Sequence, residues 1–147
     1  TPVPEDLDEA AIRETLAGFM GDQYQMPPMF SAKKVEGVPL YKHARKGREI
    51  EREPRFIRIE RLDLLGWERP NIDFRLSCSK GTYVRTLAHD IGEKLGCGGH
   101  LGTLRRTATD RFHLDDATPL ETLEAMTLPE VRRRLIPVYQ AVPSHVL

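Results

Sequence analysis

Apolar residues recur along this chain with two different periods, and the change of period separates strands from helices. Between residues 55 and 78 apolar and charged residues alternate, which is typical of half-buried β-strands. Residues 82–95 instead place apolar side chains every three or four positions, as an amphipathic helix does. The alternation predicts strands at 55–65 and 72–78, separated by a turn at 66–71 and paired as an antiparallel hairpin.

Weaker signals predict the remaining elements. A helix at 6–20 has Asp6 or Asp8 to cap it, and the acidic residues of its first turn complement the helix dipole. The apolar stripes of this helix and of helix 82–95 should form the core, and they comprise Leu7, Ala11, Leu16, Phe19, Val84, Leu87, Ala88, Ile91 and Leu95. We also predict an extended segment at 23–34, a turn at 37–39, a helix at 40–46, a helix or turn at 100–106, a strand at 111–114, helices at 119–126 and 129–135, and a linker or edge strand from 136 to 147.

Charge is distributed unevenly, although 22 basic and 22 acidic residues leave the 147-residue chain without net charge. Residues 1–30 carry six acids and one base, a net charge of −5. Residues 33–58 carry nine bases and four acids, a net charge of +5, and residues 75–106 carry six bases and two acids, a net charge of +4. Two basic blocks favour a polyanionic partner, whereas a solvated charged surface is the alternative for either block alone.

Composition narrows the class of protein. With 30% charged and 39% hydrophobic residues, the chain is typical of globular proteins. No apolar run approaches the about 18 residues of a membrane span, and the acidic N-terminal 20 residues are unlike a signal peptide, so we expect no membrane partner and a cytoplasmic location. Cys78 and Cys97 are too few for a disulfide framework or a four-ligand zinc site, and we expect no metal.

The segment SKGTYVR, residues 79–85, carries the first candidate chemistry. A strand end, a glycine turn and a helix start present side chains at the end of a sheet, where free backbone N–H groups can meet an anion. If this segment is still extended, Tyr83 and Arg85 point to the same side. A ring beside a guanidinium can stack on a base while the cation holds a carboxylate or a phosphate. The alternative is a tyrosine packed at a strand end beside a surface arginine.

Two further segments have unusual compositions. Residues 96–106, GCGGHLGTLRR, are rich in glycine but lack the GxGxxG spacing of a dinucleotide-binding loop. Residues 25–47, QMPPMFSAKKVEGVPLYKHARKG, combine basic side chains with prolines and glycines, which shape a mobile surface loop. A basic surface loop without a function is the alternative. Asp90 is a candidate acid, and an exposed helix residue is the simpler interpretation.

The three segments resemble motifs of the TruB-type tRNA pseudouridine synthases, in the same order. SKGTYVR is similar to the family's SKGTYIR, GCGGHLGTLRR to LGCGAHLxxLRR, and residues 25–47 to QxPPxYSAxKxxGxxxYxxARxG. Phe30 and Gly99 stand where the family usually has tyrosine and alanine. The resemblance covers about residues 8–125. It implies the α+β pseudouridine synthase fold, a mixed and largely antiparallel sheet flanked by helices, with this chain as the C-terminal portion of the catalytic domain.

The resemblance also implies roles for individual residues. Tyr83 would stack on the target uracil, Arg85 would pair with the catalytic aspartate, and Leu104 would pack against the flipped base. Residues 28–55 would form a thumb-like loop that docks on the T stem-loop of tRNA. The residues expected to contact RNA are Lys33, Lys34, Tyr41, Lys42, Arg45, Lys46, Arg48, Lys80, Arg105 and Arg106.

The implied reaction isomerises the T-loop uridine at position 55 of tRNA to pseudouridine without a metal or organic cofactor. On the family match Asp90 is not the nucleophile. We expect the upstream segment with the catalytic aspartate and the C-terminal PUA domain to be absent, and the chain alone to be inactive. Because half a sheet leaves an open edge, we expect the chain to associate with itself or with the missing N-terminal half, or to repack so that the edge is covered. A non-catalytic RNA-binding module of the same fold is the alternative function.

Overall fold

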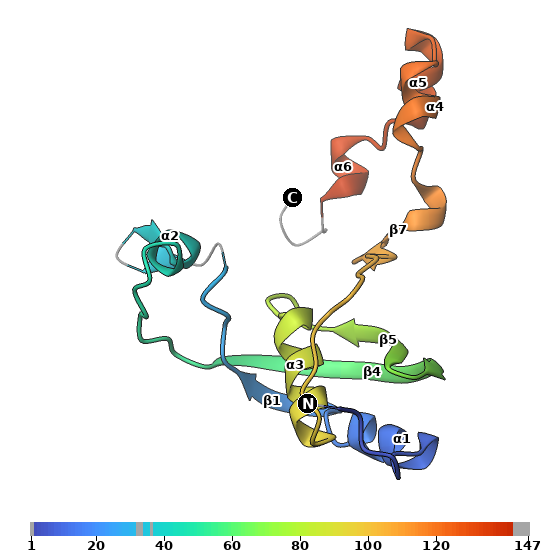
Figure 1. The fold of residues 1–147 in the computed structure, drawn as a ribbon. Helices are drawn as coiled ribbons and strands as arrows, with labels where there is room; N and C mark the ends of the chain where they lie inside the picture. The colour runs from blue at the N-terminus through green and yellow to red at the C-terminus, as the bar shows by residue number, and fades with distance from the viewer. Residues whose placement is uncertain (1, 32–33, 36, 143–147) are drawn as a thin grey trace. The chain divides into compact units, whose positions relative to one another are not determined.

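The computed structural model describes residues 2–31, 34–35 and 37–142 of the chain. It consists of two compact units that meet between residues 103 and 104, and each is described by itself. The principal sheet of the first unit contains β1 (Gly21–Gln25), β4 (Arg55–Glu68) and β5 (Asn71–Cys78), antiparallel and adjacent in that order (Figure 1). Two helices, α1 (Glu9–Ala17) and α3 (Val84–Lys94), contribute to the core beneath the sheet, which confirms the α+β class.

The hairpin predicted from the alternation is confirmed, but its first strand is longer than expected. β4 continues to Glu68, where it pairs with Asn71, instead of ending at Leu65. A register shift between Leu64 and Gly66 places one extra residue in the strand. That residue, Leu65, is 58% exposed, because a bulge turns it away from the core. The bulge therefore lets the strand accommodate two consecutive leucines and continue beyond them.

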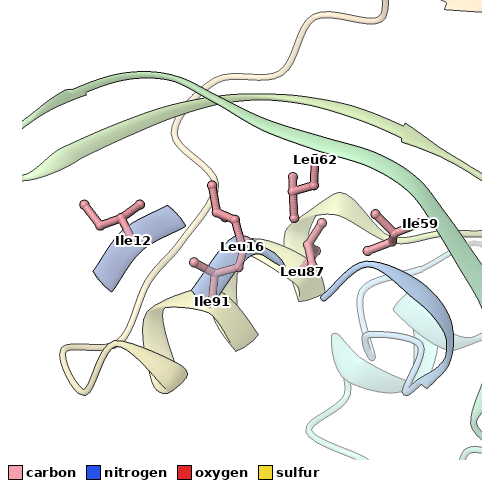
Figure 2. Close-up of a cluster of buried hydrophobic side chains, with 6 residues drawn as sticks. All are labelled: Ile12, Leu16, Ile59, Leu62, Leu87 and Ile91. Atoms are coloured by element: carbon pink, nitrogen blue, oxygen red, sulfur yellow. The ribbon is translucent and has the colours of Figure 1, made fainter. Parts of the chain in front are cut away.

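Figure 2 shows side chains from α1, α3 and β4 pointing toward one another in the principal core. The six buried members are Ile12, Leu16, Ile59, Leu62, Leu87 and Ile91. Burying each such side chain stabilises the fold by about 1.5–3 kcal/mol. The predicted stripe of α3 is confirmed at Leu87 and Ile91. For α1 the stripe omitted Ile12, which is fully buried, and the helix begins only after its cap Asp8, whose carboxylate accepts the Ala11 N–H at 2.8 Å.

The basic segment that follows β1 folds into a small hairpin and one helix. β2 (Lys34–Val35) pairs with β3 (Val38–Pro39), and α2 (Leu40–Ala44) follows directly. The predicted helix at 40–46 is therefore confirmed in position, with an end two residues earlier. Gly47, with φ of 66°, closes it. Leu40 is fully buried, so this segment has an apolar anchor of its own.

The second unit is composed of short elements. They are β6 (Ala108–Thr109), β7 (Phe112–His113), a 3₁₀ turn (Leu114–Asp116), α4 (Leu120–Glu124), α5 (Leu128–Arg134) and α6 (Val138–Ala141). Strand 111–114 and helix 119–126 are thus confirmed as shorter elements, and helix 129–135 is confirmed with the same length, beginning one residue earlier. Two predictions were wrong: residues 100–106 form neither helix nor turn, and part of the tail is the helix α6. None of the described residues of this unit is buried. No helix in the described parts of the chain could cross a membrane.

Candidate functional site

The chain passes from β5 to α3 through a short corner, residues 79–83, that hydrogen bonds hold in place. The Ser79 N–H donates to the Arg58 carbonyl at 2.9 Å, and the Arg58 N–H donates to the Ser79 hydroxyl at 2.9 Å. The Thr82 hydroxyl donates to the Ser79 carbonyl at 2.9 Å. Gly81 has φ of 89°, a conformation that side chains disfavour, which explains the glycine of this segment. The corner thereby presents Tyr83 at the start of α3.

Tyr83 is held by a glutamine from β1. The Tyr83 N–H donates to Gln25 Oε1 at 2.7 Å, and Gln25 Nε2 donates to the Tyr83 carbonyl at 3.1 Å. That carbonyl also accepts the Leu87 N–H of α3, at 3.1 Å. Gln25 is only 6% exposed. Buried amides are costly unless they are paired, and here both ends of the amide group are paired with one residue.

Arg85 connects the helix to the other motif segment. It lies in the first turn of α3 and donates from Nη2 to the Phe30 carbonyl at 2.7 Å. Because α3 begins at Val84, residues 81–85 are not extended throughout, so the condition under which alternation would place Tyr83 and Arg85 on one side is not met. Both residues instead contact the segment 25–30, so SKGTYVR and QMPPMF meet at this corner.

The basic segment forms a concave surface. A hollow of about 410 Å³ is lined by Val38, Lys42, His43, Arg45, Lys46 and Arg48. The Arg45 guanidinium lies 5.4 Å from the centre of the Tyr41 ring, a cation–π contact that orders both side chains. Four of the residues expected to contact RNA therefore surround one hollow. Lys33 lies outside the described residues, and for Lys34 only the backbone, in β2, is described.

The glycine-rich segment folds back onto α3. The N–H groups of Cys97 and Gly98 donate to the Gly92 carbonyl at 3.2 and 3.0 Å. A Cβ at Gly99 would lie 2.7 Å from a backbone oxygen of α3, and a Cβ at Gly92 would lie even closer to the backbone of residues 98 and 99. These glycines therefore permit close backbone packing, which explains their number.

The other predicted contacts lie at separate places. Lys80 is exposed in the corner that precedes Tyr83. Leu104, Arg105 and Arg106 belong to the second unit, where Leu104 is 63% exposed and Arg106 donates to the Thr109 hydroxyl at 3.1 Å. Their places beside a flipped base and RNA stay predictions.

Asp90 lies on α3 but faces away from the direction of Arg85. The two residues are five positions apart in sequence, which at 3.6 residues per turn is roughly 140° around the helix. Burial raises the pKa of the Asp90 carboxyl above its usual value; His89 lowers it and Glu93 raises it by smaller amounts. Asp90 is half-buried, so its interpretation as an exposed helix residue was wrong. The geometry does not bring Asp90 together with Arg85.

Sequence reasoning missed Gln25 as a member of the corner. Its only signal was its place as the first residue of the QMPPMF segment, within the predicted extended segment 23–34. A buried polar side chain becomes recognisable only when its partner is known, and here the partner is 58 residues away in sequence.

Comparisons with known proteins agree with the motifs. Residues 2–84 match the TruB family pseudouridylate synthase (N terminal domain), and residues 85–142 match the tRNA pseudouridylate synthase B C-terminal domain. The chain is 65% identical over 145 residues to tRNA pseudouridine synthase B of Opitutus terrae, covering 99% of this chain and 60% of that protein. It is 53% identical over 131 residues to tRNA pseudouridine synthase B of Burkholderia mallei, covering 89% of this chain and 43% of that protein.

The fold has a structural neighbour as well. A chain in the crystal structure of a Cbf5–Nop10–Gar1 complex superposes with a TM-score of 0.73 at 25% sequence identity, covering 96% of this chain and 40% of that chain. This chain thus spans 60% or less of the length of the proteins it matches. The N-terminal domain match alone covers more than half of the chain, and the motif segments all lie within matched ranges. The chain therefore belongs to the TruB family of pseudouridylate synthases.

Proposed function

We propose that the full-length protein is a tRNA pseudouridine synthase that isomerises the T-loop uridine of tRNA, and that this chain supplies the tyrosine and arginine side of its active site. One observation carries the proposal: residues 25–30 contact Tyr83 and Arg85 through three hydrogen bonds. Two family segments far apart in sequence are thereby joined at one corner. The proposal also places the protein in the cytoplasm, whose reducing conditions suit the free thiols of Cys78 and Cys97.

Arg85 has the donors that an ionised aspartate requires. A guanidinium carries five N–H groups, and the contact with the Phe30 carbonyl uses one edge of it. The remaining groups can hold a carboxylate in its charged form, which lowers the pKa of that carboxylate and keeps it nucleophilic. In this proposal the aspartate comes from a segment of the full-length protein outside this chain.

The reaction follows the family's chemistry. The aspartate carboxylate bonds to C1′ as the C1′–N1 bond breaks. The uracil then turns, and C5 bonds to C1′ as the bond to the aspartate breaks, which restores the carboxylate. C5 then loses its proton and N1 gains one, so that the product is an isomer of the substrate. Tyr83 stacks on the uracil and helps to move the C5 proton, and Leu104 packs against the flipped base. Extruding the base costs a few kcal/mol, which these apolar contacts offset. The proposal includes no cofactor.

The hollow in the basic segment supports the RNA-binding part of the proposal. Its cationic side chains form a positive surface without nearby acids in its lining, which suits the phosphates of a tRNA T arm. Each phosphate neutralised releases counterions, so binding should weaken steeply as salt increases. The sheet offers a second kind of partner: its edge strands β1 and β5 have free sides within the described residues. We propose that another part of the full-length protein, or a second copy of the chain, covers such an edge.

Tritium release from a T-arm RNA that carries 5-tritiated uridine tests the proposed function in the full-length protein. We expect release by the wild type and a loss of at least about 100-fold in the single-turnover rate for Arg85→Ala, because a charge-stabilising donor is removed. Arg13→Ala is the matched control: Arg13 is also an exposed helical arginine, paired with Glu9 at 2.6 Å. Unchanged release by Arg85→Ala would refute the role of Arg85.

The same assay distinguishes the alternative function. A non-catalytic RNA-binding module would bind the RNA without releasing tritium in the full-length form. The 147-residue chain alone should release none. Release by the chain alone would assign the nucleophile to one of its own carboxylates, with Asp90 the first to substitute.

A further inference from the structure

We propose that Gln25 is a positioning residue for this active site, which fixes where α3 begins and thereby sets the directions of the Tyr83 ring and the Arg85 guanidinium. The inference rests on the proposed function and deepens it. Its basis is the reciprocal pair of hydrogen bonds between the Gln25 amide and the two backbone groups of Tyr83, at 2.7 and 3.1 Å.

The position of Tyr83 makes this pair consequential. Tyr83 is the residue directly before α3, with φ of −97° and ψ of 103°, and its side chain forms no cap to the helix. A helix start without a side-chain cap depends on external contacts for its orientation. Gln25 supplies two such contacts. Its side-chain oxygen accepts a hydrogen bond from the Tyr83 N–H, and its side-chain nitrogen donates to the Tyr83 carbonyl, which also accepts from the Leu87 N–H. The Tyr83 carbonyl, which accepts the first hydrogen bond of α3, is thus connected to β1.

The surroundings of Gln25 make it a rigid support. It ends β1, whose residues pair with β4 up to Gln25 opposite Arg55. Beyond it the buried Pro27 fixes the backbone, and the Pro27 carbonyl accepts from Arg52 Nη1 at 3.0 Å. Because Gln25 is 6% exposed, water cannot readily replace its hydrogen bonds. The Gln25 amide therefore fixes the positions of Tyr83 and Arg85 relative to the sheet.

The chemistry requires an amide at this position. Glutamine offers one acceptor and one donor on adjacent atoms, which match the N–H and C=O of a single residue. A glutamate could accept the Tyr83 N–H, but its carboxylate cannot donate to the Tyr83 carbonyl. A methionine has nearly the same length and fills the same space without either hydrogen bond. The two substitutions therefore separate the hydrogen bonds from the packing.

The test measures the full-length protein with Gln25→Met and Gln25→Glu. We expect Gln25→Met to lower the single-turnover rate by about 10- to 100-fold, the scale of a small misplacement of reacting groups. The Kd for T-arm RNA should stay within twofold of the wild type, and the Tyr83 amide should exchange its hydrogen faster. Gln25→Glu should show a smaller loss of rate. Gln23→Ala is the matched control, since Gln23 lies on the same strand and donates to the Phe19 carbonyl instead, at 2.6 Å.

Each outcome decides the proposal. A single-turnover rate of Gln25→Met within twofold of the wild-type rate overturns the proposal. A loss of rate that a smaller folded fraction or a weaker Kd fully explains also overturns it, because Gln25 would then have only a structural role. If Gln25→Met does not fold, Gln25→Glu is judged by the same criteria. A wild type that releases no tritium refutes the proposed function, and Tyr83 amide exchange then tests the hydrogen-bond pair by itself: unchanged exchange in the variants overturns the inference.

Discussion

The close approach of residues 98–99 to α3 makes Gly92 a position where one added methyl group should be costly. A Cβ at Gly92 would lie well inside 3.0 Å of three backbone atoms of Gly98 and Gly99, and backbone cannot rotate away as a side chain can. Carbon atoms pack at about 3.5–4.0 Å, so the loop or the helix would have to move by roughly 1.5 Å. The movement would also strain the hydrogen bonds that the Gly92 carbonyl accepts from Cys97 and Gly98.

The expected magnitude follows from two opposing effects. Overpacking costs about 1–3 kcal/mol, and rigid backbone on both sides favours the upper value. Replacing glycine by alanine inside a helix returns about 1 kcal/mol of helix propensity. We therefore expect Gly92→Ala to lower the free energy of unfolding by about 2 kcal/mol. At about 4 °C per kcal/mol, this corresponds to a Tm lower by roughly 8 °C.

Thermal unfolding of the full-length protein, followed by circular dichroism, measures the effect. Gly102→Ala is the matched control, because a Cβ there meets nothing within 4 Å. That change should leave the Tm unchanged or raise it slightly, since alanine restricts the unfolded chain by up to about 1 kcal/mol. A Tm for Gly92→Ala equal to or above that of Gly102→Ala would show that the loop does not press against α3.

Two further predictions concern carboxylates. The folded-state pKa of Asp90 is raised, mainly by burial, so the stability that this group contributes is present below its unfolded pKa and is lost as pH rises through the folded pKa. Asp90→Asn should therefore raise the Tm at pH 7 but not at about pH 3. A lower Tm of this variant at pH 7 would contradict the prediction. The pKa of Glu130 is lowered because its carboxylate accepts hydrogen bonds from the Thr127 hydroxyl and N–H, at 2.6 and 2.8 Å. This capping box should be stable above the unfolded pKa and open as pH falls through the folded pKa. The opening should appear as a lower protection factor of the Thr127 amide in acid, and a protection factor independent of pH would contradict the assignment.

The parts of the fold that follow from local periodicity were predictable from sequence. The hairpin of β4 and β5 and the buried face of α3 both have strong periods, and their partners lie within the same pattern. The end of β4 was not predictable from sequence, because the bulge at Leu65 depends on the register of β4 with its partner strand β5. The helix α6 was missed because four residues are too few to show a period. The segment 100–106 was wrongly assigned, since its apolar residues are interrupted by Gly102.

The candidate site was predictable as a set of residues but not as an arrangement. Tyr83 and Arg85 were identified from their segment, whereas their connection to Gln25 and Phe30 depends on contacts across more than 50 residues of sequence. Alternation suggested that Tyr83 and Arg85 share a side, but the helix begins between them. Local sequence patterns cannot show at which residue a helix begins when tertiary hydrogen bonds fix that residue.

The corner at the start of α3 has a consequence for dividing this protein into exchangeable parts. The family's N-terminal and C-terminal domains meet between residues 84 and 85, inside the first turn of the helix. A recombinant swap at that boundary would take Tyr83 from one parent and Arg85 from another, and would pair a foreign α3 with the sheet that it covers. The compact unit instead ends at Thr103. Chimaeras joined after that residue would inherit the corner and its core from a single parent, so the compact unit, rather than the family boundary, marks the module to exchange.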